Sequence, residues 1–144
     1  MKNFREATLE MVENLKEEMG DVVYRRSKFV VGEISRIQEL VKSLEKNDFE
    51  NVGKLMTATH YGLSKDYEVS CEELDFLVDN VLLEEGVLGA RVMGGGFGGC
   101  TINLLKKTVV ENVIEKLSKA YLDKFGIALT PYQVSVSEGT HFYA

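Results

Sequence analysis

The residues with the clearest chemical potential are the glycines between positions 94 and 99. The loop consists of Gly94, Gly95, Gly96, Phe97, Gly98 and Gly99, so it holds five of the chain's 13 glycines. A segment nearly without Cβ atoms adopts positive φ readily and presents successive backbone N–H groups. Such amides bind an anion or let a ligand approach the backbone closely. The alternative is a flexible hairpin turn, which needs only one or two glycines, and the loop alone leaves both interpretations open.

Two familiar phosphate-binding loops do not fit this segment. Gly94, Gly96 and Gly99 satisfy the G-x-G-x-x-G dinucleotide pattern. That pattern requires a helix to begin at the loop, and here a strand-like segment follows it. A Walker A loop also fails, because Cys100 and Thr101 stand where it needs lysine and then serine or threonine.

Other reactive side chains have ordinary structural explanations. His60, near the end of a predicted helix, is more often a satisfied polar side chain than a general base. Arg91 could reach a phosphate, but on a strand it is expected to face solvent. Cys100 is predicted to be a packed small residue rather than a nucleophile. With Cys71 it lacks metal-ligand spacing, so we expect reduced thiols and no zinc site.

The elements that must position the loop follow from hydrophobic periodicity. Residues 3–19 predict a helix that Gly20 ends. Residues 22–46 predict a long amphipathic helix, since their apolar residues step by three and four along one face. That face consists of Val30, Ile34, Ile37, Val41 and Leu44.

Two more helices are predicted before the loop. Asn47, with an acid three residues on, predicts the capped start of a third helix that fades around residues 63–65. Ser70 with Glu73 predicts a capping box for a fourth helix, which Gly86 ends.

The pattern then changes to strands. Residues 87–93 are short and apolar, and residues 100–104 alternate apolar with polar. Thr108 is expected to cap a helix that Gly126 closes, and residues 132–137 alternate as a final strand. Helices followed by strand, strand, helix and strand predict an α+β fold, an antiparallel sheet with helices on one face.

Composition limits the classes of function. The 144 residues are 44% hydrophobic and 28% charged, with one proline and no repeat, so residues 1–144 are predicted to form a single domain. The net charge of −6 argues against binding to nucleic acid or an anionic membrane, although backbone amides could still form a phosphate site. No apolar stretch approaches the roughly 20 residues of a membrane span, and we expect a cytoplasmic protein.

Three segments resemble galactokinases of the GHMP kinase superfamily. They are residues 25–33 (RRSKFVVGE), 59–75 (THYGLSKDYEVSCEELD) and 89–100 (GARVMGGGFGGC). The third is similar to the family's third signature motif nearly letter for letter, and the second separates galactokinases from other members. The likeness runs from about residue 5 to residue 142, and it departs mildly from the family at Ser64–Lys65.

The resemblance implies a ferredoxin-like GHMP kinase carboxy-terminal domain preceded by helices. The complete enzyme would transfer the γ-phosphoryl group of Mg-ATP to the anomeric hydroxyl of galactose. Its galactose signature, serine-rich nucleotide loop and catalytic aspartate belong to an amino-terminal domain, and none of them stands in this sequence. The chain is therefore expected to be half of the enzyme, inactive alone, with no catalytic residue and no metal ligand of its own. ATP and Mg²⁺ are the implied cofactors, and galactose and ATP would bind together with the missing half.

Within that half, residues 94–99 would be the cofactor-binding segment. They would touch the ligand, brace the nucleotide loop of the other domain, or form a plain turn. Residues 66–68 could order the loop before Ser70 and shape the cleft, or form an ordinary capped loop. An apolar patch exposed near the glycine loop would favour self-association.

Two other functions compete with the half-enzyme interpretation. The first is a non-catalytic module, derived from a galactokinase, that binds a sugar, a nucleotide or a regulatory protein. The second is a GHMP kinase for another small alcohol, such as mevalonate or homoserine. Residues 66–70 (DYEVS) speak against that second alternative, because they resemble galactokinases in particular.

Overall fold

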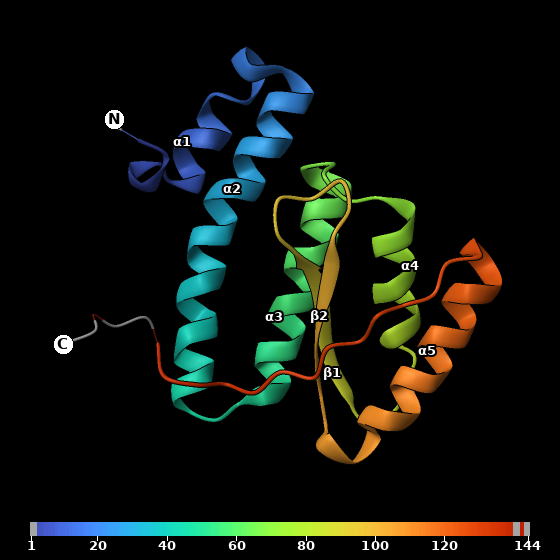
Figure 1. Ribbon diagram of the computed structural model, residues 1–144. Helices are drawn as coiled ribbons and strands as arrows, with labels where there is room; N and C mark the ends of the chain where they lie inside the picture. Colours follow the sequence, from blue (N-terminus) through green and yellow to red (C-terminus); the bar gives the residue numbers. More distant parts are fainter. Residues whose placement is uncertain (1–2, 140–141, 143–144) are drawn as a thin grey trace.

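The computed structural model describes residues 3–139 and 142, and it has the predicted α+β architecture (Figure 1). The main elements in chain order are α1 (Leu9–Asn14), α2 (Lys16–Glu45), α3 (Phe49–Tyr61), α4 (Glu72–Val81), β1 (Val87–Met93), β2 (Cys100–Leu105) and α5 (Val110–Phe125). Among the described helices, none is both long and apolar enough to cross a membrane.

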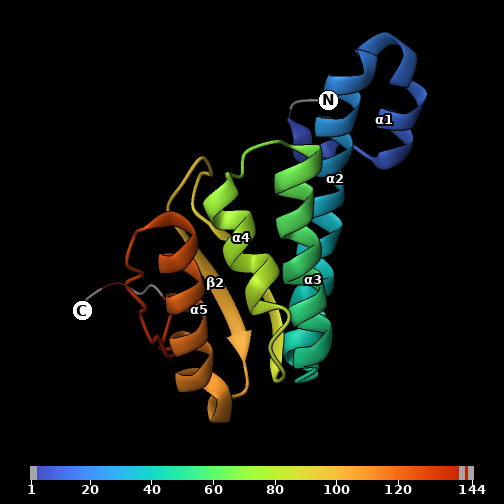
Figure 2. The ribbon, with the colours of Figure 1, turned by 90° about the vertical axis from the view of Figure 1, so that its right-hand side faces the viewer.

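The two strands form an antiparallel sheet with helices packed on one face. Their register runs from Val87 opposite Leu105 to Met93 opposite Cys100. Helices α4 and α5 lie together on one side of the strands in two perpendicular views (Figures 1 and 2). The buried cluster between them consists of Val78, Val81, Ala90 and Val113. Since these side chains are almost fully removed from water, their burial is the main apolar contribution to this half of the fold.

Helix α3 lies along the edge of β1 that does not face β2. The Ala90 N–H donates to Thr57 Oγ1 at 3.3 Å, and the Val92 N–H donates to His60 Nδ1 at 3.3 Å. Both acceptors belong to α3, so its side chains take the place of a neighbouring strand. An unpaired strand edge offers a row of free amides to other chains, and here a helix covers that row.

Two glycines allow this close approach. A Cβ atom at Gly53 would overlap the carbonyl of Leu88, and one at Gly89 would overlap the backbone of Gly53. The helix and the strand therefore meet backbone to backbone. Any side chain at either position would push α3 away from β1 and stretch the two hydrogen bonds to the strand edge.

Helix α2 packs behind α3 and also carries α1. The Thr59 hydroxyl donates to Glu33 at 3.0 Å, and the ring of Phe29 occupies the space that a Cβ of Gly62 would need. On the other side of α2, Lys28 bonds to Glu13 of α1 at 2.7 Å. The long helix thus links the amino-terminal residues to the α3 layer.

The predicted apolar face of α2 is present but largely uncovered. Ile37, Val41 and Leu44 expose 59%, 48% and 45% of their surface, while Val30 and Ile34 are half-buried. Residues of the stripe stand next to residues of α2 that face α3. Successive residues of a helix are rotated by about 100° around its axis, so the stripe points in another direction. The stripe is therefore turned away from α3, and its carboxy-terminal half forms a largely exposed apolar surface.

The amino-terminal helices differ in detail from the prediction. Residues 3–19 do not form one helix: they hold the 3₁₀ turn Phe4–Glu6, α1 and the start of α2. Gly20 does interrupt the helix, with φ of 69°, but the chain resumes its helical path at once within α2. Asn47 is not the cap of α3. It has φ of 55°, and Asp48 caps the helix by accepting the Asn51 N–H at 3.0 Å.

Two other predicted caps are wrong, and one helix end is confirmed. Helix α4 begins at Glu72 without a side-chain cap from Ser70. Helix α5 begins at Val110, after the 3₁₀ turn Lys107–Val109, so Thr108 is not its cap. Gly126 does close α5, with φ of 69° and its N–H donating to Leu122 at 2.8 Å.

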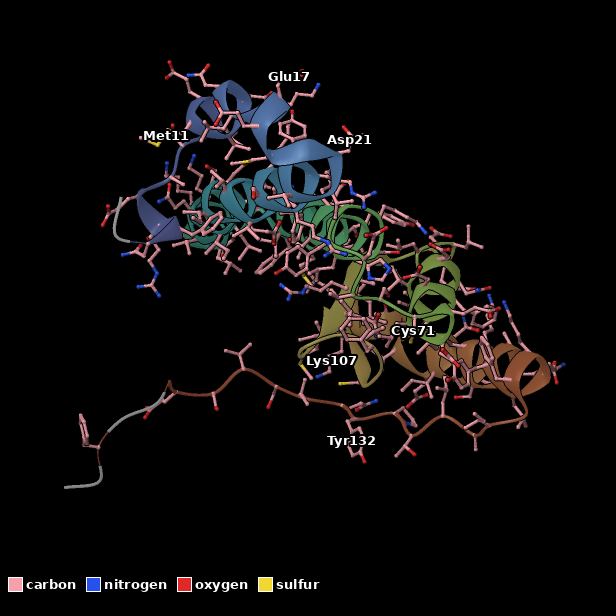
Figure 3. All side chains as sticks on the ribbon, turned by 90° about the horizontal axis from the view of Figure 1, so that it is seen from above. Met11, Glu17, Asp21, Cys71, Lys107 and Tyr132 are labelled. Atoms are coloured by element: carbon pink, nitrogen blue, oxygen red, sulfur yellow. The ribbon has the colours of Figure 1, made fainter. Side chains whose placement is uncertain are left out.

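The predicted strand at residues 132–137 does not form in this chain. Residues 127–138 are neither helical nor paired, and Tyr132, Val134 and Val136 expose 83%, 80% and 102% of their surface. Figure 3 shows Tyr132 on an extended segment that runs apart from the helices. A strand pattern becomes a strand only when an edge accepts its backbone and a face buries its side chains. Neither is supplied to residues 132–137 by the described part of the chain.

We predict that Gly53→Ala destabilises the protein, because the added methyl group must separate α3 from β1. The expected loss is about 1–3 kcal/mol in the free energy of unfolding, measured by chemical denaturation. Gly32→Ala is the matched control: it lies in helix α2, and no atom lies within 4 Å of the position that its added methyl group would take. That variant should be neutral or more stable by about 0.5–1 kcal/mol. Equal stabilities of the two variants would contradict the contact.

Candidate functional site

The glycine loop joins β1 to β2 and has a backbone that few other residues could adopt. The φ angles are 99° at Gly94, 90° at Gly96, 141° at Gly98 and 107° at Gly99. Phe97 also has a positive φ, 59°, which is uncommon for a residue with a side chain. The concentration of glycine is therefore a conformational requirement of this turn.

The loop is fixed to the rest of the chain at one point. The Phe97 N–H donates to the Val69 carbonyl at 2.7 Å, and a Cβ at Gly96 would overlap the same carbonyl. Within the described residues, no other amide of the loop donates to a carbonyl. The Phe97 side chain is 75% exposed. Most of the loop's N–H groups thus remain available to an anion or to a neighbouring protein surface.

Val69 is held in turn by an ion-pair cluster on Glu68. The Glu68 Oε2 atom lies 2.8 Å from Arg25 Nη2 and 3.0 Å from Arg26 Nη2. The hydrogen bond from Arg26 and the charge of Arg25 hold the pKa of Glu68 below its ordinary value. Glu68 has φ of 61°, so the arginines stabilise an unusual backbone angle directly before Val69. We call these three charged residues the Glu68 clamp.

A second polar cluster forms around Asp75 of α4. Ser64 donates to Asp75 Oδ2 at 2.7 Å, and Lys65 Nζ lies 3.5 Å from the same oxygen. Burial would raise the pKa of Asp75, but the hydroxyl groups of Ser70 and Ser64 and the charge of Lys65 lower it overall. Ser64 and Lys65 belong to the π-helical turn Gly62–Asp66 that continues α3. The cluster therefore ties that turn to α4.

His60 has a structural role between α3, β1 and α4. It is completely buried, and its Nδ1 atom accepts the Val92 N–H, so that nitrogen carries no proton. Burial holds the pKa of His60 below its ordinary value, which keeps the ring neutral. Its Nε2 atom faces Asp75 Oδ1 at 3.4 Å. His60 is thus buried inside the fold and not exposed at the surface of a cleft, but only Nδ1 is hydrogen-bonded, because Nε2 has no hydrogen-bond partner among the described residues.

Arg91 and the two cysteines have less defined surroundings. Arg91 lies on the sheet face opposite Ala90 and Val92, half-buried, and its Nε donates to the Val92 carbonyl at 3.0 Å. Cys100 is exposed, so the prediction that it packs as a small residue is wrong: it sits at the open end of β2 beside the loop. Both cysteines are free thiols, and burial raises the pKa of Cys71.

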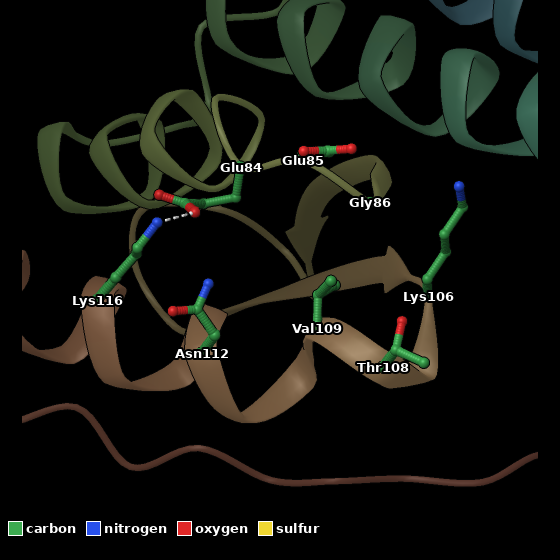
Figure 4. A pocket seen from close by; sticks show the side chains of 8 residues that line it. All are labelled: Glu84, Glu85, Gly86, Lys106, Thr108, Val109, Asn112 and Lys116. Carbon is green, nitrogen blue, oxygen red and sulfur yellow. Dashed lines mark hydrogen bonds and ion pairs between the residues drawn. The ribbon is translucent and has the colours of Figure 1, made fainter.

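A sizeable hollow lies at the opposite end of the strands. Figure 4 shows this pocket of about 360 Å³ between the start of β1 and the start of α5. Lys116 bonds to Glu84 at 2.6 Å across it, so its principal charges neutralise each other. The pocket is remote from the loop because Gly86 and Lys106, which line it, flank the far ends of β1 and β2. In the described residues, no group of three or more His, Cys, Asp or Glu side chains could hold a metal ion.

Comparison with protein families identifies the class of this domain. Residues 40–123, more than half of the chain, match the family model described as GHMP kinases C terminal. The chain therefore belongs to the GHMP kinases and corresponds to their carboxy-terminal domain.

Within that class, the chain is similar to the carboxy-terminal part of proteins that are galactokinases. Galactokinase from Thermotoga neapolitana is 43% identical over 138 residues, 96% of this chain and 38% of the relative. Bos taurus galactokinase is 41% identical over 120 residues, 83% of this chain and 31% of the relative. The crystal structure of Lactococcus lactis galactokinase complexed with galactose superposes with a TM-score of 0.83 at 30% identity. It covers 89% of this chain and 33% of that structure, so this chain spans about a third of its relatives' length.

The structure brings together the three segments that resemble galactokinases. Arg25 and Arg26 come from the first segment, Glu68 and Val69 from the second, and the loop from the third. Sequence reasoning identified each segment but missed their contacts. The Val69 carbonyl in particular carries no signal in the sequence, because any residue supplies a carbonyl.

We predict that Glu68→Gln loosens the glycine loop, since a neutral amide cannot hold both arginines. The amide signals of Gly96 and Phe97 in NMR spectra should shift and broaden, and the Phe97 N–H should exchange faster with solvent. Glu50→Gln, on the exposed start of α3, is the control and should leave these signals unchanged.

Acid should act on the same contact. Because the pKa of Glu68 is depressed in the folded protein, the clamp stabilises the fold above pH 4.5 and is lost as pH falls through the lower folded value. The loop signals of the unmodified protein should then move toward those of Glu68→Gln. If neither the substitution nor acidification changes the amide signals of the loop, the clamp does not position the loop.

Proposed function

We propose that this chain is the carboxy-terminal domain of an enzyme that phosphorylates galactose with ATP. The observation that carries the proposal is the loop at residues 94–99, whose amides are open and whose backbone is anchored to a galactokinase-like segment at Val69. In the reaction, the anomeric oxygen of galactose bonds to the γ-phosphorus, and the bond from that phosphorus to the β-phosphate oxygen breaks. Such transfers depend on positioning and on stabilising charge on the phosphoryl oxygens.

The loop's contribution is to close the active-site cleft over the phosphates. Backbone N–H groups at Gly94, Gly95, Gly98 and Gly99 can donate to phosphoryl oxygens without a side chain between them. The residues present thus fit the phosphate end of ATP. The same amides could instead brace the nucleotide loop of the other domain. We place them at the phosphates because they donate to no carbonyl group in the described chain.

The rest of the catalytic machinery is assigned to an amino-terminal domain. In this proposal, that domain supplies the base that takes the galactose proton, most of the nucleotide contacts and the ligands of Mg²⁺. It also covers the exposed stripe of α2, which includes Ile37 and Leu44. The free thiols of Cys71 and Cys100 suit a reducing compartment, so the proposed location is the cytoplasm.

The proposal predicts that the chain alone does not phosphorylate galactose. Activity should emerge when it is mixed with a separately produced amino-terminal part of a galactokinase, as measured by galactose-dependent ADP formation. Gly96→Val should abolish the gain, because its side chain would overlap Val69. Gly139→Val, outside the loop with no atom near its Cβ position, is the control.

The alternative function is a non-catalytic module that binds a sugar, a nucleotide or a regulatory protein. Activity of the chain alone would contradict the half-enzyme proposal. A stable complex of the two parts that binds ATP or galactose but forms no ADP would favour the module.

We propose further that the isolated chain self-associates through apolar groups beside the glycine loop. Phe97 and Met93 are 75% and 48% exposed there, whereas soluble surfaces rarely cluster such side chains. Sedimentation at high protein concentration should show a species larger than the monomer, and Phe97→Lys should reduce it. Leu83→Lys is the matched control, since Leu83 is 82% exposed at the end of α4. A strictly monomeric chain, or equal effects of the two variants, would contradict this association surface.

A further inference from the structure

The glycine loop is supported at two places by other elements of the fold. At its entrance β1 ends with Val92 and Met93, and the Val92 N–H donates to His60 Nδ1 at 3.3 Å. Within the loop, the Phe97 N–H donates to the Val69 carbonyl at 2.7 Å. We call these contacts the entrance support and the middle support. The shape of the loop therefore depends on where His60 and Val69 lie relative to each other.

The entrance support leads from His60 to Asp75. Burial keeps the His60 ring neutral by lowering its pKa, and Nδ1 accepts the Val92 N–H, so the ring carries its proton on Nε2. That Nε2 atom faces Asp75 Oδ1 at 3.4 Å, and neither atom has a hydrogen-bond partner among the described residues. Both atoms are buried, where attraction between an N–H group and a carboxylate is weakly screened. The carboxylate thus favours the ring orientation that presents Nδ1 to β1.

The middle support leads to the same carboxylate by another route. The Val69 N–H donates to the Leu63 carbonyl at 3.0 Å, in the π-helical turn that continues α3. The next residue of that turn, Ser64, donates its hydroxyl to Asp75 Oδ2 at 2.7 Å. The hydroxyl of Ser70, directly after Val69, also acts on Asp75 and lowers its pKa. The peptide that holds the loop at Phe97 is thus connected to the first turn of α4.

Asp75 itself lies on a well-packed helix. It belongs to the first turn of α4, where its N–H donates to the Cys71 carbonyl at 3.0 Å. Leu74 and Val78 of the same helix are almost completely buried. The amino-terminal turn of a helix also stabilises a negative charge. The position of the Asp75 carboxylate is therefore determined by the core of the domain and does not depend on the loop.

We infer that Asp75 is a positioning residue for the glycine loop. Its Oδ1 atom orients His60 at the entrance support, and its Oδ2 atom holds the turn that carries Val69 at the middle support. One carboxylate on α4 thereby sets the distance between the start of the loop and the point where the loop is anchored. The use of this placement in phosphoryl transfer rests on the proposed function, whereas the placement itself does not.

A neighbouring carboxylate of α4 provides a comparison. Asp79 lies about one helical turn after Asp75 and accepts the Tyr61 hydroxyl at 2.8 Å. That hydrogen bond also joins α3 to α4, but it leads to neither support of the loop. A residue that merely holds the two helices together should therefore behave as Asp79 does.

The test is hydrogen exchange of single amides, followed by NMR on the full chain. Asp75→Ala removes both oxygens at once, so both supports should loosen. We expect the exchange of the Val92 and Phe97 amides to accelerate by about fivefold more than that of the amides of α5. Asp79→Ala is the matched control, and it should not accelerate these two amides relative to α5.

Ser64→Ala separates the two supports. It removes only the contact with Asp75 Oδ2, so the Phe97 amide should exchange faster while the Val92 amide keeps its rate. In the double variant with Asp75→Ala, it should cause no further acceleration at Phe97, because the contact is already lost. This variant tests the middle support even if Asp75→Ala does not fold.

The His60 ring supplies a readout that a general loosening of the fold would not change. After burial, the influences on the pKa of the ring are, in order of size, the charges of Asp75, Asp79, Lys65 and Arg91. Asp75→Ala should shift the ¹⁵N signal of Nε2 and lower the pKa of the ring further, since a nearby carboxylate favours the protonated form. Asp79→Ala should change both quantities less.

Four outcomes would overturn the inference. Faster exchange at only one of the two amides in Asp75→Ala would show that the supports are independent. Equal effects of Asp75→Ala and Asp79→Ala would reduce Asp75 to an ordinary link between helices, as would an equal acceleration throughout α5. An unchanged Phe97 amide in Ser64→Ala would show that the route through the turn does not hold the loop.

Activity separates this inference from the proposed function. In the mixture with an amino-terminal part of a galactokinase, Asp75→Ala should lower kcat more than it raises KM for galactose. If the unmodified mixture forms no ADP, the proposed catalysis fails, and the exchange rates still decide the role of Asp75. If the mixture forms ADP with the same kcat in Asp75→Ala, the positioning role in the reaction is refuted.

Discussion

The backbone contact between Gly53 and Gly89 is the constraint on which the arrangement of this domain depends. It lets α3 approach β1 closely enough for Thr57 and His60 to accept the strand's outward amides. Once α3 occupies that edge, α4 and α5 are left to cover the face of the sheet, and α2 can pack only behind α3. A fully buried imidazole at the centre of these layers is tolerated because burial keeps it neutral and the Val92 N–H of the strand occupies its Nδ1 atom.

The position of the glycine loop depends on contacts far from it in the sequence. The Val69 carbonyl holds the loop, Glu68 sets the backbone before Val69, and Arg25 and Arg26 hold Glu68 from α2. The three clamp side chains are each partly exposed, so any one ion pair contributes little to global stability. Their importance is geometric, since they fix where a flexible glycine segment begins and ends. A chain with a net charge of −6 thereby keeps two positive side chains close to its candidate phosphate-binding loop.

Local sequence signals predicted the elements well and their surroundings poorly. Both strands of the hairpin and the end of α5 at Gly126 follow from patterns within a few residues. The prediction of helix caps failed where two candidate cap residues are adjacent, as at Asn47 and Asp48. A residue with left-handed backbone angles beside a cap does not alter the hydrophobic periodicity of the sequence, so the pattern does not reveal it. Residues 132–137 failed for a different reason: a strand needs an edge to pair with, and no pattern within the segment says whether that edge is present. For the site, composition revealed the loop but could not reveal its carbonyl anchor.

The covering of one sheet edge by a helix also determines how copies of this domain could join. Growth of a cross-β filament requires every layer to offer two free edges, one to the layer before and one to the layer after. Here α3 blocks the β1 side, so growth of the two-stranded sheet itself is limited to the β2 side in the described chain. Two copies joined in that way would form a closed, two-fold pair and stop. The same helix that completes the fold thus prevents further strand pairing at the β1 edge of the sheet.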